Sequence, residues 1–288
     1  MLIDQIRRVA RTEGVAGLVS RTVDRVLQRR SRGFLALQDR FRERRALEIG
    51  GPSACFCRRG YFPIYPLLAG VDNCNFADAT IWEGAIASGR SFRFDADRPP
   101  GRQFIAEATD LSGCDTASYD VILSSHTIEH TANPLRALLE WRRVLTDGGL
   151  LVLIAPHRDG TFDHRRPITA LDHLIADSDR GTGEDDRTHL PEILRLHDRA
   201  RDAGGPSAEA FRERSEGNLA NRALHHHVFD TPSVEAMLRH AGFRPLAVEA
   251  RRPYNIVVVA QKAETAAEIP PPLRFAGPFP SDRGVAGG

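Results

Sequence analysis

The sequence predicts an α/β domain with a doubly wound, mostly parallel sheet of seven strands and an inserted lid between the fifth and sixth strands. Short apolar runs alternate with amphipathic helical segments between residues 44 and 262. Residues 157–224 interrupt this alternation with a polar stretch that has few strand signals, and we expect it to cover one end of the sheet as a substrate-side insertion. Strands are expected at 46–49, 68–71, 104–106, 119–123, 150–154, 244–248 and 256–260.

Two helices between these strands have clear boundaries in the sequence. The first has an apolar face over residues 135–145, and Gly148 with Gly149 is expected to end it. The second is expected to take Thr231 as its N-cap and to stop at Gly242. Each of these helices lies between two predicted strands, as a parallel sheet requires.

The two ends of the chain differ from this central domain, residues 44–262. Residues 1–43 form a basic segment with apolar residues at helical spacing, which predicts helices that pack on the domain or associate weakly with a membrane surface or a partner. Residues 263–288 are rich in Pro and Gly, and we expect an extended or disordered tail.

Composition excludes several classes of partner. The formal net charge of the 288 residues is +1, which gives no general attraction to nucleic acid. No apolar stretch approaches the roughly 20 residues that span a bilayer, so stable membrane insertion is not expected. The four cysteines lack metal-type spacing, which favours reduced thiols and a cytoplasmic location. The oligomeric state stays open.

The first predicted strand runs into two adjacent glycines, Gly50 and Gly51, followed by Pro52. Such a bend brings main-chain atoms and the start of a helix against a polar or anionic ligand. No third glycine follows at dinucleotide spacing, so a pyrophosphate is poorly supported. Asp72, at the expected end of the second strand, has the position of a carboxylate that binds the hydroxyls of a ribose.

Two later motifs carry a family resemblance. The segments YDVILSSHTIEH (119–130) and RVLTDGGLLVL (143–153), in this order after the glycine bend, resemble the class I S-adenosylmethionine-dependent methyltransferases, in particular a small-molecule subgroup. The resemblance covers residues 44–157 and resumes over 225–262. It implies a Rossmann-like sheet, a methyltransferase activity and S-adenosyl-L-methionine as the cofactor.

The resemblance also implies roles for individual residues. The cofactor-binding residues that it implies are Glu48, Gly50 and Gly51 at the methionine end, Asp72 at the ribose, Glu107 and Ala108 at the adenine, and Ser125 beside the methionine moiety. Asp110 is an alternative to Glu107.

All eleven histidines fall between positions 126 and 240. Because an imidazole titrates near neutral pH, it is a natural base for a hydroxyl that is being methylated. The catalytic candidates are His126, His157 and His227, with His164, His225 and His226 also open. Acidic and histidine residues of 184–197 could ligate a metal together with His225 or His227, but they lack a tight ligand spacing, and we expect no catalytic metal.

The sequence therefore favours an enzyme that O-methylates a hydrophilic small molecule or a sugar or glycoconjugate precursor. The insertion is polar and contains few aromatic residues, which favours such an acceptor over a hydrophobic one. N-methylation of an aminosugar or a natural product is the alternative within this class. A nicotinamide-dependent oxidoreductase or epimerase, and a non-catalytic adaptor that acts through residues 1–45, are less favoured.

Overall fold

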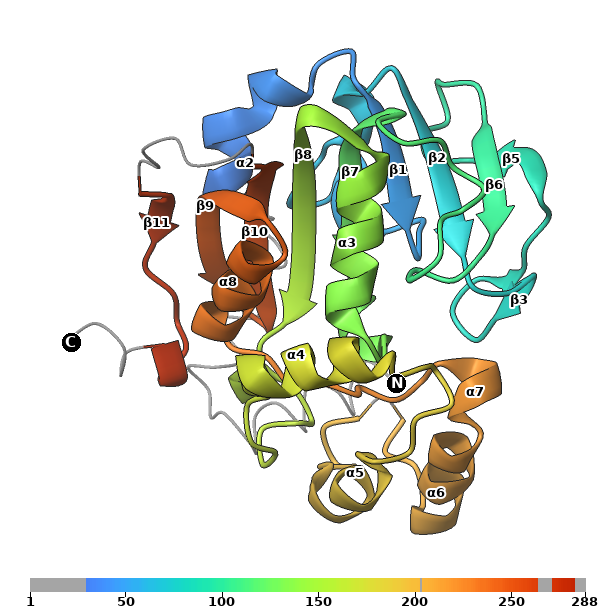
Figure 1. The fold of residues 1–288 in the computed structure, drawn as a ribbon, viewed down its shortest axis with the longest axis vertical. Helices are drawn as coiled ribbons and strands as arrows, with labels where there is room; N and C mark the ends of the chain where they lie inside the picture. Colours follow the sequence, from blue (N-terminus) through green and yellow to red (C-terminus); the bar gives the residue numbers. More distant parts are fainter. Residues whose placement is uncertain (1–29, 203, 264–270, 283–288) are drawn as a thin grey trace.

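The computed structural model describes residues 30–202, 204–263 and 271–282. In this part of the chain, nine strands form one sheet in the order β11-β9-β10-β8-β7-β1-β2-β6-β5, and β3 pairs with β4 in a small hairpin (Figure 1). The strands are β1 (Arg45–Ile49), β2 (Gly70–Asn75), β3 (Ala79–Thr80), β4 (Gly84–Ala85), β5 (Gly89–Phe92), β6 (Gly101–Ile105), β7 (Tyr119–Ser125), β8 (Leu145–Pro156), β9 (Phe243–Arg251), β10 (Asn255–Lys262) and β11 (Leu273–Phe275).

The centre of the sheet is parallel. Strands β6, β2, β1, β7 and β8 pair parallel to one another in this order. On either side of them, β5 is antiparallel to β6, and β10 is antiparallel to both β8 and β9. The predicted α/β class with a mostly parallel, Rossmann-like sheet is confirmed. All seven predicted strands are present, and the edge strands β5 and β11 extend the sheet beyond them.

The second strand lies further along the chain than predicted, at Gly70–Asn75. Its polar residues Asp72, Asn73 and Asn75 conceal the strand from an apolar pattern, yet all three are buried. Their side chains are hydrogen-bonded within the fold, and these bonds offset the free-energy cost of removing the polar groups from water. The shift changes which residue stands at the end of the strand.

The α-helices of the described chain are α2 (Arg32–Leu37), α3 (Pro134–Val144), α4 (Leu171–Arg180), α5 (Leu190–Leu196), α6 (Ala208–Glu216), α7 (Asn218–Asn221) and α8 (Thr231–His240). Two predicted boundaries were wrong. Helix α3 ends at Val144 because Leu145 already starts β8, so Gly148 and Gly149 lie inside the strand segment. Helix α8 takes Asp230 as its N-cap, because its side chain accepts the Ser233 N–H in a capping box.

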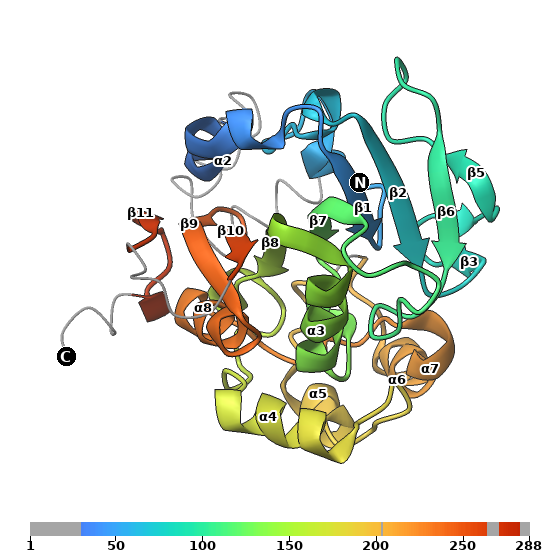
Figure 2. The ribbon, with the colours of Figure 1, turned by 45° about the horizontal axis from the view of Figure 1, so that its top comes forward.

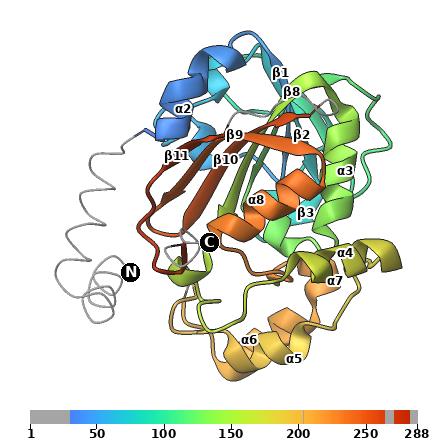
Figure 3. The same ribbon diagram turned by 60° about the vertical axis from the view of Figure 1, so that its left-hand side comes forward.

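The two faces of the sheet are covered differently. Helices α3 and α8 lie on one face and α2 on the other (Figure 3). The second face is otherwise covered by rings from the segment between β1 and β2, where Phe62 packs edge-on against Phe34, Phe41 and Phe56. Short 3-10 turns at Ala54–Phe56 and Tyr65–Leu67 replace a helix here, so the helix expected directly after the glycine bend is absent from this segment.

The insertion lies where it was expected. Helices α4, α5, α6 and α7 gather beyond the carboxyl ends of the parallel strands, at the bottom of Figure 1, and the turned view of Figure 2 keeps them on that side. A small apolar cluster of Ile193, Phe211 and Leu224 joins α5, α6 and the segment after α7. Any site at the carboxyl edge of the sheet is therefore covered by this insertion.

Both chain ends contribute to the domain where they are described. Of the predicted basic segment, residues 1–29 lie outside the described residues, but Phe34 on α2 is buried against the sheet and the Ser31 hydroxyl donates to Glu249. In the tail, residues 271–282 supply β11, and Phe279 is buried. For those residues the tail packs on the domain, with an extended strand at Leu273–Phe275.

Within the described ranges, no helix is long and apolar enough to cross a membrane. The four cysteines are all free thiols.

Candidate functional site

The site lies where the order of the strands reverses. In open α/β sheets, ligands bind outside the carboxyl ends of the strands at such a switch point. Here the chain leaves β1 toward β2 on one side, while β7 pairs with β1 on the other side. The residues that follow β1, β2, β6 and β7 therefore share one edge, directly under the insertion.

The glycine bend after β1 is filled by side chains of the protein itself. Gly50 has a φ of +82°, and a Cβ there would lie 2.5 Å from the Thr127 hydroxyl oxygen. A Cβ on Gly51 would lie 2.2 Å from the carboxyl carbon of Glu48. The close neighbours that require these glycines are thus Thr127 and Glu48. This corrects the expectation that the bend is bare in order to clear space for a ligand.

Glu48 ends β1 as a fully buried carboxyl group. It accepts hydrogen bonds from the Tyr65 hydroxyl at 2.5 Å and from the backbone N–H of Ser53 at 3.1 Å. Burial raises the pKa of Glu48 to about 7, although both hydrogen bonds act in the opposite direction. Neither partner is a cation, so the ionised form of Glu48 is poorly compensated.

Asp72 does not stand at the end of its strand. It is the third residue of β2 and lies opposite Leu47 of β1, away from the carboxyl edge. Its carboxylate accepts hydrogen bonds from the Tyr119 hydroxyl, an Arg45 guanidinium N–H and the Arg102 backbone N–H. The predicted end of this strand, at residue 71, was four residues too early, because β2 ends at Asn75. The position of Asp72 in the structure gives no support to its expected role at the ribose.

Asn75 occupies the strand-end position instead. It is buried, and its side-chain amide donates to the carbonyl of Gly51 at 3.1 Å. Asn73, two residues earlier, also donates to that carbonyl, and its own oxygen accepts the Gly51 N–H at 3.0 Å. The two asparagines therefore fix the bend after β1 to the end of β2.

Glu107 lies at the carboxyl edge, in the turn after β6, as expected. It accepts a hydrogen bond from Arg222 of the insertion at 2.5 Å, and the Arg222 guanidinium lies 5.2 Å from the centre of the Phe76 ring. The carbonyl of Ala108 accepts the Trp141 indole N–H at 2.9 Å. The alternative, Asp110, caps its own turn at Ser112. Arg222 thus closes the insertion over the end of β6.

The end of β7 carries two serines with different surroundings. The Ser124 hydroxyl is buried and has no hydrogen-bond partner among the described residues. The Ser125 hydroxyl is half-buried and accepts the Cys55 thiol at a sulfur–oxygen distance of 3.4 Å. Ser125 thereby joins β7 to the segment after the glycine bend, in the place where the sequence expects a residue beside the cofactor.

His126 follows directly, with a φ of +54°. Its Nε2 lies 2.9 Å from Oδ1 of Asn255, its Nδ1 lies 3.5 Å from a carboxylate oxygen of Glu129, and its ring meets Tyr254 edge-on. Burial alone would lower the pKa of His126, but the hydrogen bond and negative charge of Glu129 outweigh it and raise the pKa. The side chain keeps 31% of its surface exposed.

Glu129 is the functional candidate that the sequence prediction missed. It is fully buried, and the nearer oxygen lies 3.8 Å from Nε2 of His130 and 4.0 Å from Nε2 of His225. Burial would raise its pKa, but His126 and the other two imidazoles lower it, which favours a carboxylate. A lone acid between two histidines directly after a strand, as in HTIEH, is the signal that could have identified it.

The other two predicted bases are enclosed. The side chain of His157 is fully buried, stacks on Phe279 at 3.9 Å between ring centres and bonds Asp282 through Nε2 at 3.1 Å. His227 is also fully buried, with Nε2 3.1 Å from the Ala132 carbonyl oxygen. Both imidazoles are buried, so neither is accessible to a substrate from solvent in this structure. Of the three predicted bases, His126 alone keeps access to solvent.

One family model matches the part of the chain that contains the end of β7. Residues 67–153, from the approach to β2 through most of β8, match the family model described as a methyltransferase domain. A search of curated protein sequences finds no match.

Among solved structures, the chain is similar to a protein from Bacillus halodurans C-125 described as a methyltransferase (11% identity, 81% of this chain and 100% of that one, TM-score 0.46). It is also similar to S-adenosylmethionine-dependent methyltransferases from Mesorhizobium loti (16% identity, 80% and 95%, TM-score 0.46) and Listeria monocytogenes (16% identity, 81% and 97%, TM-score 0.46).

Proposed function

We propose that this chain is an S-adenosylmethionine-dependent methyltransferase that methylates a hydroxyl group of a hydrophilic small molecule, of the sugar or glycoconjugate-precursor class, with His126 as the general base. The observation that carries the proposal is the pair of His126 and Glu129 at the end of β7. This pair combines a partly exposed imidazole of raised pKa with a buried carboxylate, at the switch point of the sheet.

The residues at the carboxyl edge suit a ligand that is cationic at its methionine end. Glu48 is a buried carboxyl without a cationic partner among its hydrogen bonds, and the buried Ser124 hydroxyl is unpaired in the described chain. We propose that Ser125 and the segment after β1 hold the methionine part, and that Glu107 holds the adenosine part. When bound, S-adenosylmethionine supplies a methyl group that is already activated on a sulfonium sulfur.

His126 then has one task, the removal of a proton. In the contact with Oδ1 of Asn255, the Nε2 atom donates its proton. Once that contact opens and the proton of the neutral ring lies on Nδ1, toward Glu129, Nε2 has a lone pair. An acceptor hydroxyl that replaces Asn255 at Nε2 would give its proton to His126 while its oxygen forms the new bond to the methyl carbon. The bond from that carbon to sulfur would break in the same displacement, and its electron pair would leave with the neutral thioether. Glu129 stabilises the resulting imidazolium, as the carboxylate of a catalytic dyad does. The exposed part of the ring returns the proton to solvent.

Two exposed aromatic side chains, one beside His126 and one beside the neighbouring His130, support a sugar-like acceptor. Trp82, on the β3–β4 hairpin, is 53% exposed and lies 5.3 Å from His130 between ring centres. Tyr254 is also exposed and contacts His126. An aromatic ring offers a flat apolar surface to the C–H face of a sugar, and the hydroxyls of the sugar remain free to meet the polar insertion.

The experiment is a screen of acceptors with the purified full chain and S-adenosylmethionine. Sugars, nucleotide sugars and glycosides are compared with their amino-sugar analogues, and the modified atom is located by mass spectrometry and NMR. We expect methylation on oxygen, with kcat reduced about 10²–10⁴-fold by His126→Asn and little change in the affinity for S-adenosylhomocysteine. Methylation on nitrogen alone, or a fully active His126→Asn variant, would contradict the proposal.

A further inference from the structure

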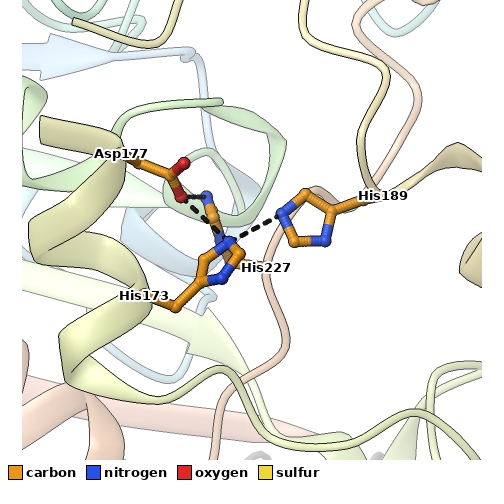
Figure 4. A group of neighbouring side chains, drawn as sticks. All are labelled: His173, Asp177, His189 and His227. Atoms are coloured by element: carbon orange, nitrogen blue, oxygen red, sulfur yellow. Dashed lines mark hydrogen bonds and ion pairs between the residues drawn. The ribbon is translucent and has the colours of Figure 1, made fainter. Parts of the chain in front are cut away.

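Four potential metal ligands meet at the base of the insertion, and neither His126 nor Glu129 is among them. His173 and Asp177 lie on α4, His189 precedes α5, and His227 lies on the segment that returns to the sheet (Figure 4). One ring nitrogen of each histidine and one carboxylate oxygen of Asp177 all lie within 4.8 Å of one another. Two parts of the insertion and the segment that follows it are thus brought to one point, which we call the α4 cluster.

The distances within the α4 cluster are those of ligands around a shared centre. Nε2 of His173 lies 3.1 Å from Nε2 of His189 and 3.1 Å from Oδ2 of Asp177. The His227 ring lies beside this group, with its Nε2 4.0 Å from the same oxygen. A tetrahedral zinc ion with bonds of about 2.0–2.1 Å holds its ligand atoms about 3.3–3.4 Å apart. Small side-chain rotations therefore suffice to place an ion among them.

Two buried atoms of the α4 cluster have no hydrogen-bond partner among the described residues: Oδ2 of Asp177 and Nδ1 of His227. The other oxygen of Asp177 accepts hydrogen bonds from Arg180 and Thr182, so Oδ2 remains for the imidazoles. His227 has the carbonyl of Ala132 as a partner for Nε2–H, which leaves a lone pair on Nδ1. Buried polar atoms of this kind are costly unless a ligand satisfies them.

We propose that the α4 cluster binds one zinc-class divalent ion through His173, Asp177, His189 and His227, and that this ion fastens the insertion to the domain. Three imidazoles with one carboxylate suit Zn²⁺ or Co²⁺, whereas Mg²⁺ and Ca²⁺ require mainly oxygen ligands. The contacts of Ala132 with His227 and of Arg180 with Asp177 are the supporting hydrogen bonds that ligands of a metal commonly have. The ion takes no part in the proton transfer at His126.

The test uses the untagged full chain, stripped with a chelator and dialysed against Zn²⁺. We expect one zinc per chain by elemental analysis and a rise in Tm of roughly 5–10 °C at a hundredfold excess over Kd. Co²⁺ should give the intense visible bands of a four-coordinate site. His173→Gln and His189→Ala should each lose both signals, while the metal-free variants keep the circular dichroism of the stripped wild-type chain.

His164→Ala is the matched control, because His164 lies in the same insertion but pairs with Asp198 outside the α4 cluster. It should bind zinc as the wild-type chain does. His173 keeps 41% of its side chain exposed, so His173→Gln tests the site with little risk to folding. Zinc that is retained by both cluster variants, or a chain that takes up no zinc, would overturn the proposal. Loss of methyl transfer alone does not bear on it, because both readouts are independent of activity.

Discussion

Replacement of the buried Glu48 by glutamine should stabilise the protein at alkaline pH and leave it nearly unchanged at acid pH. Burial raises the pKa of Glu48 from 4.5 to about 7 in the folded chain. Glutamine fits the same space, since its oxygen can accept the Ser53 N–H and its amide can donate to the Tyr65 hydroxyl, which already lies within hydrogen-bond distance of Glu48. The substitution therefore removes the charge and keeps the two contacts.

The size of the effect follows from the shift in pKa. The shift from 4.5 to about 7 spans about 2.5 units, and one unit is about 1.4 kcal/mol, so ionisation of Glu48 costs the folded state about 3 kcal/mol. Between these two pKa values the folded chain keeps a proton that the unfolded chain has released. The free energy of unfolding of the wild type consequently falls as pH rises from about 4.5 to 7, and is constant above that range.

The assay is urea unfolding of the wild type and Glu48→Gln between pH 5 and 8.5, followed by circular dichroism. The difference in the free energy of unfolding should grow with pH to about 3 kcal/mol in favour of the variant. Glu216→Gln, at an exposed position near the end of α6, is the control and should give a flat difference. A Glu48→Gln difference that does not depend on pH would refute the assignment of a raised pKa to this carboxyl.

Three further predictions concern the site itself. Glu129→Gln should move the acid limb of kcat/KM to lower pH, because the rate rises as His126 deprotonates and the buried carboxylate raises the pKa of that imidazole. A limb of the pH–rate profile that does not move would show that Glu129 does not act on this base. Arg222→Met should tighten the binding of S-adenosylhomocysteine about fivefold, as measured by calorimetry, because it removes the hydrogen bond that occupies Glu107. Weaker binding would instead make Arg222 part of the cofactor site. Trp82→Ala should raise the KM for a sugar acceptor about tenfold and leave kcat unchanged. Ile81 is exposed on the same hairpin, and Ile81→Ala should leave both constants unchanged. Equal effects of the two substitutions would exclude a specific stacking role for Trp82.

The fold was accessible from the sequence because its signals are local. Apolar runs such as 119–123 and 150–154 are strands of the expected type. The helix at 134–144 buries Leu135, Leu138 and Val144 of its predicted apolar face, whereas Leu139 is exposed. The methyltransferase assignment has the same origin, since its motifs occupy consecutive residues between β2 and β8. Boundaries were less accurate where a polar residue lies inside a strand, as Asp72 does, or where a neighbouring element competes for a terminus.

The residue types of the site could likewise be predicted from the sequence, since histidines follow β7 and a glycine bend follows β1. Which of those groups touch each other was decided by tertiary packing. Glu129 meets His225 only because the insertion folds back over the carboxyl edge, and the side chain that fills the space at Gly50 belongs to the loop after β7. The physical reason is that strand and helix propensities act over a few residues, whereas burial, charge compensation and metal-type clusters depend on contacts between distant segments.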